Sequence, residues 1–243
     1  MAQPERERAG DGALAYDWGV QTFLSDVTHT GEVENITNPR WWRQARDEIV
    51  ALQQAVSRKG SKRSNRRTKA VHRLAAARAR VARRRMDWAH QQTAALAGKY
   101  ALVATEELTL GNMTRSASGT AEEPGRQVAR KAGLNREILD TAPGLLTSLL
   151  RYKVLETGGE WVDAPTKQLK PSQRCPNCWQ VEKKTLSQRA HACAHCGHEE
   201  PGDTASARVV LRWALESKSG QELAETGVRC TLETPSFALH RVE

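Results

Sequence analysis

The sequence has no long apolar run. Only 39% of its 243 residues are hydrophobic, and no stretch approaches the roughly 18 to 20 apolar residues that a membrane-spanning helix needs. The first residues, Met1 to Gly12, are polar and charged and lack the apolar segment of a secretory signal peptide. We therefore expect a globular protein of the cytoplasm without a membrane partner, and the sequence leaves the oligomeric state open.

Glycine-rich phosphate-binding motifs are also missing. The 17 glycines form neither the G-x-G-x-x-G signature of dinucleotide-binding folds nor a P-loop. We also find no internal repeat. These absences argue against a Rossmann dehydrogenase, a P-loop nucleotide hydrolase and a repeat protein.

Cysteine is scarce, but its spacing is informative. Four of the five cysteines form two C-x-x-C pairs, Cys175 with Cys178 and Cys193 with Cys196, separated by fourteen residues. Four thiolates in two close pairs can complete a tetrahedral zinc site of the structural type. Disulfides are rare in the cytoplasm, so we expect structural Zn²⁺ here and an ordinary thiol at Cys230.

Three histidines, His191, His195 and His198, lie in or beside this segment. Their spacing also fits alternative metal ligation. Because four cysteines already complete a tetrahedral set, we expect the histidines to face solvent or to contact nucleic acid.

Acidic residues are missing from one long segment. Between Arg58 and Arg85 the chain has thirteen Lys or Arg and no Asp or Glu, within a net charge of +9. A solvated helix face is the ordinary interpretation of a charge run, but unbalanced positive charge favours phosphate contact, with DNA and RNA both open. The candidate nucleic-acid-binding residues are Arg58, Lys59, Lys62, Arg63, Arg66, Arg67 and Lys69.

Hydrophobic periodicity predicts an alternation of strands and helices. The expected strands are Ala13–Asp17, Thr22–Asp26, Glu32–Ile36, Tyr100–Thr105 and Trp161–Val162. The expected helical segments are a hairpin over Arg40–Ala97 broken near Gly60, a helix over Leu134–Leu155, and a helix opened by Asp203 that carries Val209, Val210, Trp213 and Leu215 on or near one face. A Ser116–Gly125 loop separates the two halves.

Three carboxylates occupy the ends of these elements: Asp17, Glu106 and Asp203. If they converge, their oxygens supply the hard ligands that Mg²⁺ or Mn²⁺ prefers. Taken singly, they are better explained as a turn residue, an exposed strand end and a helix N-cap. Glu107 competes with Glu106, because adjacent residues of a strand point to opposite faces, and the pattern alone leaves that choice open.

Several motifs follow one another in an informative order. They are Ala15–Val20 (AYDWGV), Ala104–Met113 (ATEELTLGNM), Gly133–Asp140, Leu150–Lys153, Pro171–Cys178, Cys193–Gly197 and finally Asp203. Together they resemble the RuvC nuclease portion of TnpB proteins, the OrfB family of insertion-sequence genes, which is related to type V CRISPR effector nucleases. The resemblance runs from about Ala13 to Leu215, which is most of the chain.

The resemblance implies an RNase H-like α/β fold: a mixed sheet with flanking helices, a basic helical hairpin and an inserted zinc ribbon. Residues 1–171 then form the first part of the core, with the hairpin at 40–99; residues 172–200 form the ribbon, 201–220 the last core helix and 221–243 a C-terminal tail. In the family the first acid of the Glu106–Glu107 pair is catalytic, which favours Glu106, together with Asp17 and Asp203.

The implied activity is hydrolysis of DNA phosphodiester bonds by two-metal catalysis with Mg²⁺ or Mn²⁺, directed in full-length relatives by a guide RNA. Two departures limit this expectation. After the third acid the family usually has Asn and small residues, whereas this chain has Gly202–Ala207 (GDTASA). The chain also begins almost at the first motif, without the domains that hold guide RNA. The alternative is a catalytically weak nucleic-acid-binding transposon remnant or regulator.

Overall fold

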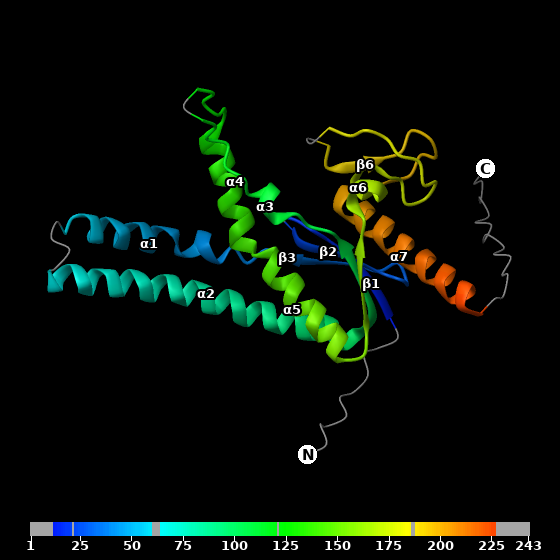
Figure 1. Cartoon of the computed structure of the whole chain (residues 1–243), viewed down its shortest axis with the longest axis horizontal. Helices are drawn as coiled ribbons and strands as arrows, with labels where there is room; N and C mark the ends of the chain where they lie inside the picture. The colour runs from blue at the N-terminus through cyan, green and yellow to red at the C-terminus, as the bar shows by residue number, and fades with distance from the viewer. Residues whose placement is uncertain (1–11, 21, 60–63, 121, 186–187, 227–243) are drawn as a thin grey trace, which may run out of the picture.

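The computed structural model describes residues 12–20, 22–59, 64–120, 122–185 and 188–226 (Figure 1). Its strands are β1 (Gly12–Trp18), β2 (Thr22–Thr28), β3 (Val33–Thr37), β4 (Tyr100–Glu106), β5 (Glu160–Ala164), β6 (Ala190–Ala192) and β7 (Glu199–Pro201). Its helices are α1 (Trp41–Ser57), α2 (Asn65–Lys99), α3 (Leu110–Met113), α4 (Val128–Thr141), α5 (Pro143–Glu156), α6 (Thr166–Leu169), the 3₁₀ turn η1 (Pro171–Gln173) and α7 (Gly202–Thr226).

A five-stranded mixed sheet forms the centre, in the order β3-β2-β1-β4-β5. The first three strands form an antiparallel meander, whereas β4 pairs parallel to β1 and β5 pairs parallel to β4. A parallel pair needs a long crossover connection, and the hairpin of α1 and α2 supplies it between β1–β3 and β4. The predicted mixed α/β fold is confirmed, including the strands expected from alternation.

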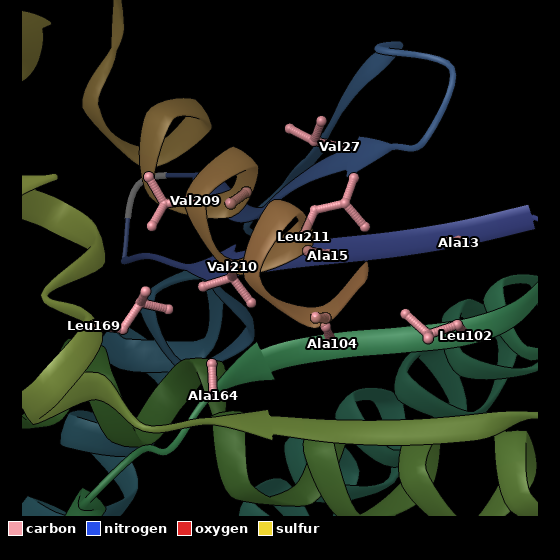
Figure 2. Close-up of a cluster of buried hydrophobic side chains, with 12 residues drawn as sticks. Ala13, Ala15, Val27, Leu102, Ala104, Ala164, Leu169, Val209, Val210 and Leu211 are labelled. Atoms are coloured by element: carbon pink, nitrogen blue, oxygen red, sulfur yellow. The ribbon is translucent and has the colours of Figure 1, made fainter. Parts of the chain in front are cut away.

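Helices cover both faces of the sheet, each over its own apolar cluster. On one face α7 packs against β1, β4 and β5, and the contact is made largely by alanines and valines (Figure 2). On the other face α2 and α5 contribute Leu96, Leu150 and Val154 against Tyr16 and Phe23 of the sheet. The result is a three-layer core, as the doubly buried central strands require.

The helical hairpin projects from this core, as Figure 1 shows at its left. A small third cluster, centred on Ile49 of α1 and on Ala77 and Val81 of α2, holds the two helices together. At its base the hairpin is fastened by the buried carboxylate of Asp140, which accepts a 2.6 Å bond from Arg85 and bonds of 2.9 and 3.0 Å from the backbone N–H of Trp42. The predicted hairpin is confirmed; the turn expected near Gly60 lies outside the described residues.

The expected single helix over Leu134–Leu155 is wrong. Two helices, α4 and α5, occupy the region, and α4 begins at Val128. Between them Ala142 adopts a left-handed conformation with φ of 48°, and Pro143 starts α5. Proline disfavours helical geometry at the residue before it and lacks an N–H group, so a continuous helix cannot pass this point.

The last helix also differs from the expectation. α7 continues to Thr226, six residues past the predicted end at residue 220, because its sequence there consists mainly of good helix formers. Its apolar face includes Val209 and Val210, which are buried, and Trp213, which is half-buried, whereas Leu215 is exposed. No helix in the described part of the chain is long and apolar enough to cross a membrane.

Two leucines of α5 provide a matched test of this packing. Leu150 is fully buried, whereas Leu155 on the same helix is 52% exposed. We expect Leu150→Ala to lower the free energy of unfolding by about 2–5 kcal/mol, because it leaves a cavity between α5 and the sheet. Leu155→Ala should change it by less than about 1 kcal/mol. Chemical denaturation followed by circular dichroism measures both, and equal losses would contradict the packing described here.

Candidate active site and metal centre

Asp17 lies near the end of β1, after four buried residues that anchor the strand between β2 and β4. Its carboxylate is half-buried and lines a cavity of about 600 Å³. Burial raises the pKa of Asp17 well above its ordinary value, and the negative charges of Glu106 and Asp203 raise it further. Glu106 and Asp203 therefore both lie near enough for their charge to act on Asp17, but the donor atoms of the three acids do not all lie within 4.8 Å of one another.

Glu106 ends β4, the parallel neighbour of β1. Because Tyr16 pairs with Thr105, the next residues, Asp17 and Glu106, emerge at the same edge of the sheet. Both line the 600 Å³ cavity, and burial raises the pKa of Glu106 to about 7, partly offset by a hydrogen bond from Thr166. The carboxyl ends of adjacent parallel strands are the usual place for a site in open α/β sheets.

Glu107 also lines this cavity, but it is exposed, whereas Glu106 is half-buried. Its backbone N–H donates to the carbonyl oxygen of Ala164, and its own carbonyl accepts a 3.3 Å bond from the Thr166 hydroxyl. Of the two acids, Glu106 is the one whose charge acts on Asp17.

Asp203 comes from the opposite side of the sheet edge, in the first turn of α7. It is exposed and lines a neighbouring cavity of about 660 Å³, which shares Trp18 and Met113 with the first. A Cβ atom on Gly19 would lie 3.7 Å from Asp203 Oδ2 and only 2.6 Å from the Thr22 carbonyl oxygen. The turn after β1 therefore needs glycine, and it borders the carboxylate of Asp203.

The cysteines are brought together as predicted. Among the described residues, Cys175, Cys178, Cys193 and Cys196 form the one group of three or more potential ligands whose donor atoms all lie within 4.8 Å of one another. The sulfurs of Cys175 and Cys196 are 3.6 Å apart, and those of Cys178 and Cys193 are 3.5 Å apart. A ZnS₄ tetrahedron with Zn–S bonds near 2.3 Å has edges of about 3.8 Å, so the cluster fits a four-thiolate metal site.

The two halves of the cluster share one backbone design. Trp179 donates its N–H to the Cys175 carbonyl and Gly197 donates to that of Cys193, each four residues after the first cysteine of its pair. Both residues have positive φ, 66° at Trp179 and 73° at Gly197. Burial raises the pKa of Cys178 to about 12, whereas the backbone N–H of His198 lowers that of Cys196 to about 6. A bound cation would favour the thiolate form of all four.

The ribbon rests on α7, the helix that carries Asp203. Arg212 of α7 donates to the carbonyl oxygens of Pro176 and Asn177 at 3.1 and 3.3 Å. The indole of Trp179 lies against two guanidinium groups, with Arg212 4.4 Å and Arg174 5.1 Å from its centroid. These contacts make the ribbon and the acidic edge parts of one packed unit.

The expectation for the histidines is wrong for His191, which is buried at 2% exposure with Nδ1 in contact with Lys184 Nζ. His191 is the middle residue of β6, and its side chain is buried because successive residues of a strand point to opposite faces. His195 is exposed, and His198 pairs with Glu200 at 3.0 Å.

The predicted nucleic-acid-binding residues lie at the tip of the helical hairpin, far from the acidic edge (Figure 1). Arg58, Lys59, Arg66 and Lys69 are exposed and Arg67 is half-buried, whereas Lys62 and Arg63 lie outside the described residues. Sequence reasoning missed the residues that complete the acidic cavity, namely Trp18, Thr166, Lys167, Ser172 and Ser206. Thr166, Lys167 and Ser172 come from short segments that carry no periodic signal, whereas Trp18 ends β1 and Ser206 lies in α7, where periodicity predicts the element but not its contact with the cavity.

Comparison with known proteins gives two family matches in different parts of the chain. Residues 1–117 match OrfB_IS605, described as a probable transposase, and residues 144–210 match the Cas12f1-like TNB domain. The chain is 34% identical over 180 residues to the "Putative RNA-guided DNA endonuclease InsQ" of Escherichia coli (strain K12), covering 74% of this chain and 44% of the relative. It is 29% identical over 202 residues to a "Putative RNA-guided DNA endonuclease" of Streptomyces pristinaespiralis, covering 83% and 46%.

Two solved structures share the fold. The Cas12f1–sgRNA–target DNA complex has a TM-score of 0.52 at 14% identity, covering 83% of this chain and 49% of that chain. A CRISPR–Cas12f ternary complex has a TM-score of 0.57 at 16% identity, covering 86% and 40%. At these identities the likeness concerns the fold alone.

The chain spans less than half the length of the curated relatives it matches, 44% and 46%. Within that span the family matches, the relatives and the fold agree with the order of motifs from Ala15 to Asp203. They confirm the resemblance: residues 1–117 are similar to the OrfB_IS605 family, residues 144–210 are similar to the Cas12f1-like TNB domain, and the fold is shared with the two Cas12f structures.

Proposed function

We propose that this chain is a nuclease module that hydrolyses DNA phosphodiester bonds at the edge of its central sheet. The observation that carries the proposal is the placement of Asp17 and Glu106 at adjacent parallel strand ends on one cavity, with the charge of Asp203 acting on Asp17. Converging carboxylates on a solvent-accessible cavity suit phosphoryl chemistry better than a structural role, because crowded like charges oppose folding.

Asp17, Glu106 and Asp203 would hold Mg²⁺ or Mn²⁺. Their carboxylate oxygens are the donors that these hard ions prefer, and a cation would compensate negative charge that is otherwise crowded together. When bound, such ions activate a water molecule and stabilise the leaving oxygen of a phosphodiester. Lys167, which lines the same cavity, would attract a substrate phosphate, and Thr166 would restrain the Glu106 carboxylate.

We infer DNA as the substrate from the two relatives, both of which are named as putative RNA-guided DNA endonucleases. We propose a guide RNA as the partner of full-length relatives, and a cytoplasmic location for this chain. The acidic set argues against the alternative of a protein that only binds nucleic acid, since binding alone does not need three neighbouring carboxylates.

Glu106, which ends β4, and Glu107, the residue after it, provide an internal control for the catalytic assignment. We expect Asp17→Asn and Glu106→Gln each to reduce Mg²⁺-dependent cleavage of labelled single-stranded DNA by more than about 100-fold, since even outer-shell losses cost about 10- to 100-fold. Glu107→Gln should retain most of the activity.

Cleavage that survives Asp17→Asn would remove the assignment. A loss in Glu107→Gln with activity kept in Glu106→Gln would exchange the roles of the two acids. A wild-type chain that binds DNA but cuts under neither Mg²⁺ nor Mn²⁺ would establish the binding-only alternative.

We propose Zn²⁺ for the four-cysteine site, as a structural ion. Zinc removal by a chelator, or Cys178→Ser, should increase amide hydrogen exchange across the ribbon, because its two short strands enclose little apolar surface without the metal. Amides of β1 and β4 should stay protected and serve as the control. Unchanged exchange in the ribbon after verified zinc loss would contradict a structural site.

The hairpin tip is proposed as a second nucleic-acid contact. Replacing Lys59, Arg66 and Lys69 by Gln removes three exposed charges. On single-stranded DNA this should reduce the slope of log affinity against log salt by about 2, at about 0.7 per phosphate. Fluorescence anisotropy at several salt concentrations measures the slope, and an unchanged slope would show that the tip is only a solvated helix end.

A further inference from the structure

A strongly basic cavity of about 710 Å³ lies between the beginning of α4 and the ribbon. It is lined by Ala117, Arg126, Gln127, Arg130, Lys131, Leu134 and Arg189. Four of these side chains are basic, and none of the described lining residues is acidic. Figure 1 shows α4 and the ribbon on either side of α3.

The charges of this cavity are available for a ligand. Arg126, Arg130 and Arg189 are exposed, and none of them forms an ion pair with a residue in the described part of the chain. Arg130 makes a long 3.4 Å contact with the Gln127 side chain. Lys131 instead donates to the carbonyl oxygen of Met113, which joins α4 to α3. Three guanidinium groups therefore face a hollow without a partner of opposite charge.

This cavity is continuous with the acidic site. It shares Leu134 and Arg189 with the cavity that holds Asp203, and that cavity in turn shares Trp18 and Met113 with the one that holds Asp17 and Glu106. The three hollows therefore form one path whose outer end is basic and whose inner end is acidic.

The length of the path suits a short polynucleotide segment. From Arg130 to Ile138, which lines the middle cavity, α4 advances about 12 Å at 1.5 Å per residue. The basic cavity and the cavity of Asp203 are therefore about two turns of α4 apart, a distance that a segment of a few nucleotides can span.

The lining favours a single strand over a duplex. Leu134, 46% exposed, and Trp18, half-buried, sit at the two junctions of the path. A single strand can turn its base faces onto such apolar groups while its phosphates meet arginines, whereas a duplex hides those faces by stacking.

We propose that Arg126, Arg130 and Arg189 form a phosphate-binding site that receives single-stranded DNA a few nucleotides from the acidic centre. The proposal rests on the proposed nuclease function for its direction toward Asp17, but binding at the basic end is independent of cleavage. The site is separate from the hairpin tip. A strand bound there would contact both α4 and the ribbon.

The binding test uses the full chain and a fluorescein-labelled 12-nucleotide oligothymidylate, without added Mg²⁺ or Mn²⁺ so that no cleavage occurs. We expect the combined Arg126→Gln, Arg130→Gln and Arg189→Gln variant to reduce the salt slope by about 2, at about 0.7 per phosphate contact. The single variant Arg130→Gln should reduce it by about 0.7. Arg136→Gln is the matched control, since Arg136 is exposed on the same helix but does not line the cavity.

Circular dichroism of each variant checks that the fold is kept. The proposal fails if the triple variant keeps the wild-type salt slope, or if Arg136→Gln lowers the slope as much as Arg130→Gln. It also fails as a single-stranded DNA site if the loss is as large for a 12-base-pair duplex, or if it appears only with oligouridylate, which would assign the surface to RNA.

A second measurement locates the contact relative to the cut. A neutral methylphosphonate linkage is moved one position at a time through the few nucleotides on either side of the scissile bond. At the position that the arginines contact, it should slow wild-type cleavage but cause no additional loss in the triple variant. If the linkage and the triple variant each reduce cleavage and their losses add at every position, the proposed contact of the arginines with a phosphate near the cut is wrong. Absence of any cleavage would count against the proposed nuclease function alone, because the binding test decides the phosphate site without it.

Discussion

The parallel pairing of β1 with β4 is the constraint on which the rest of this structure depends. The register sets Tyr16 beside Thr105, so that the next residue of each strand is a carboxylate at one edge of the sheet. Side chains alternate along a strand, so a slip of one residue would turn Glu106 away from Asp17 and bring Glu107 into its place. The order of the two acids is therefore meaningful only because the register is fixed.

Packing on both faces fixes that register. On the α7 face, near the acidic edge, β1 and β4 present Ala15 and Ala104, both fully buried. On the other face Leu14 and Val103 meet α2 and α5. A slip of one residue would exchange these faces, placing alanines where the α2 and α5 cluster needs volume and Leu14 or Val103 where α7 packs against alanine.

Much of this arrangement was predictable from the sequence, and the failures have physical causes. The apolar run that ends at Glu106 predicts the acidic edge, because a buried strand is recognisable from local periodicity. The two C-x-x-C pairs predict the four-cysteine cluster from their spacing. The exact position of a helix break and the burial of a single side chain were harder to predict from the sequence. The helix break at Ala142 follows from Pro143, which apolar spacing concealed, and the burial of His191 depends on the ribbon fold.

The basic cavity was not predictable at all. Its arginines are separated by up to 63 positions, from Arg126 to Arg189, and they meet only after α4 and the ribbon have packed around α3. The dense run between Arg58 and Arg85 was conspicuous in the sequence, yet its tip lies far from the acids (Figure 1). Charge density along a chain therefore identifies an affinity for phosphate, whereas the path to a reactive centre is a property of the assembled surface.

α7 joins these features because one helix serves the sheet, the acidic edge and the ribbon. Its first turn carries Asp203, its apolar face covers β1 and β4, and Arg212 holds the Cys175 to Trp179 turn by two hydrogen bonds and a ring contact. A shift of α7 would therefore move Asp203 and the ribbon together. Arg189 belongs to the ribbon and lines the same cavity as Asp203. The proposed metal binding at the cysteines and strand binding at the basic cavity would therefore both act on the part of the structure that sets the position of Asp203.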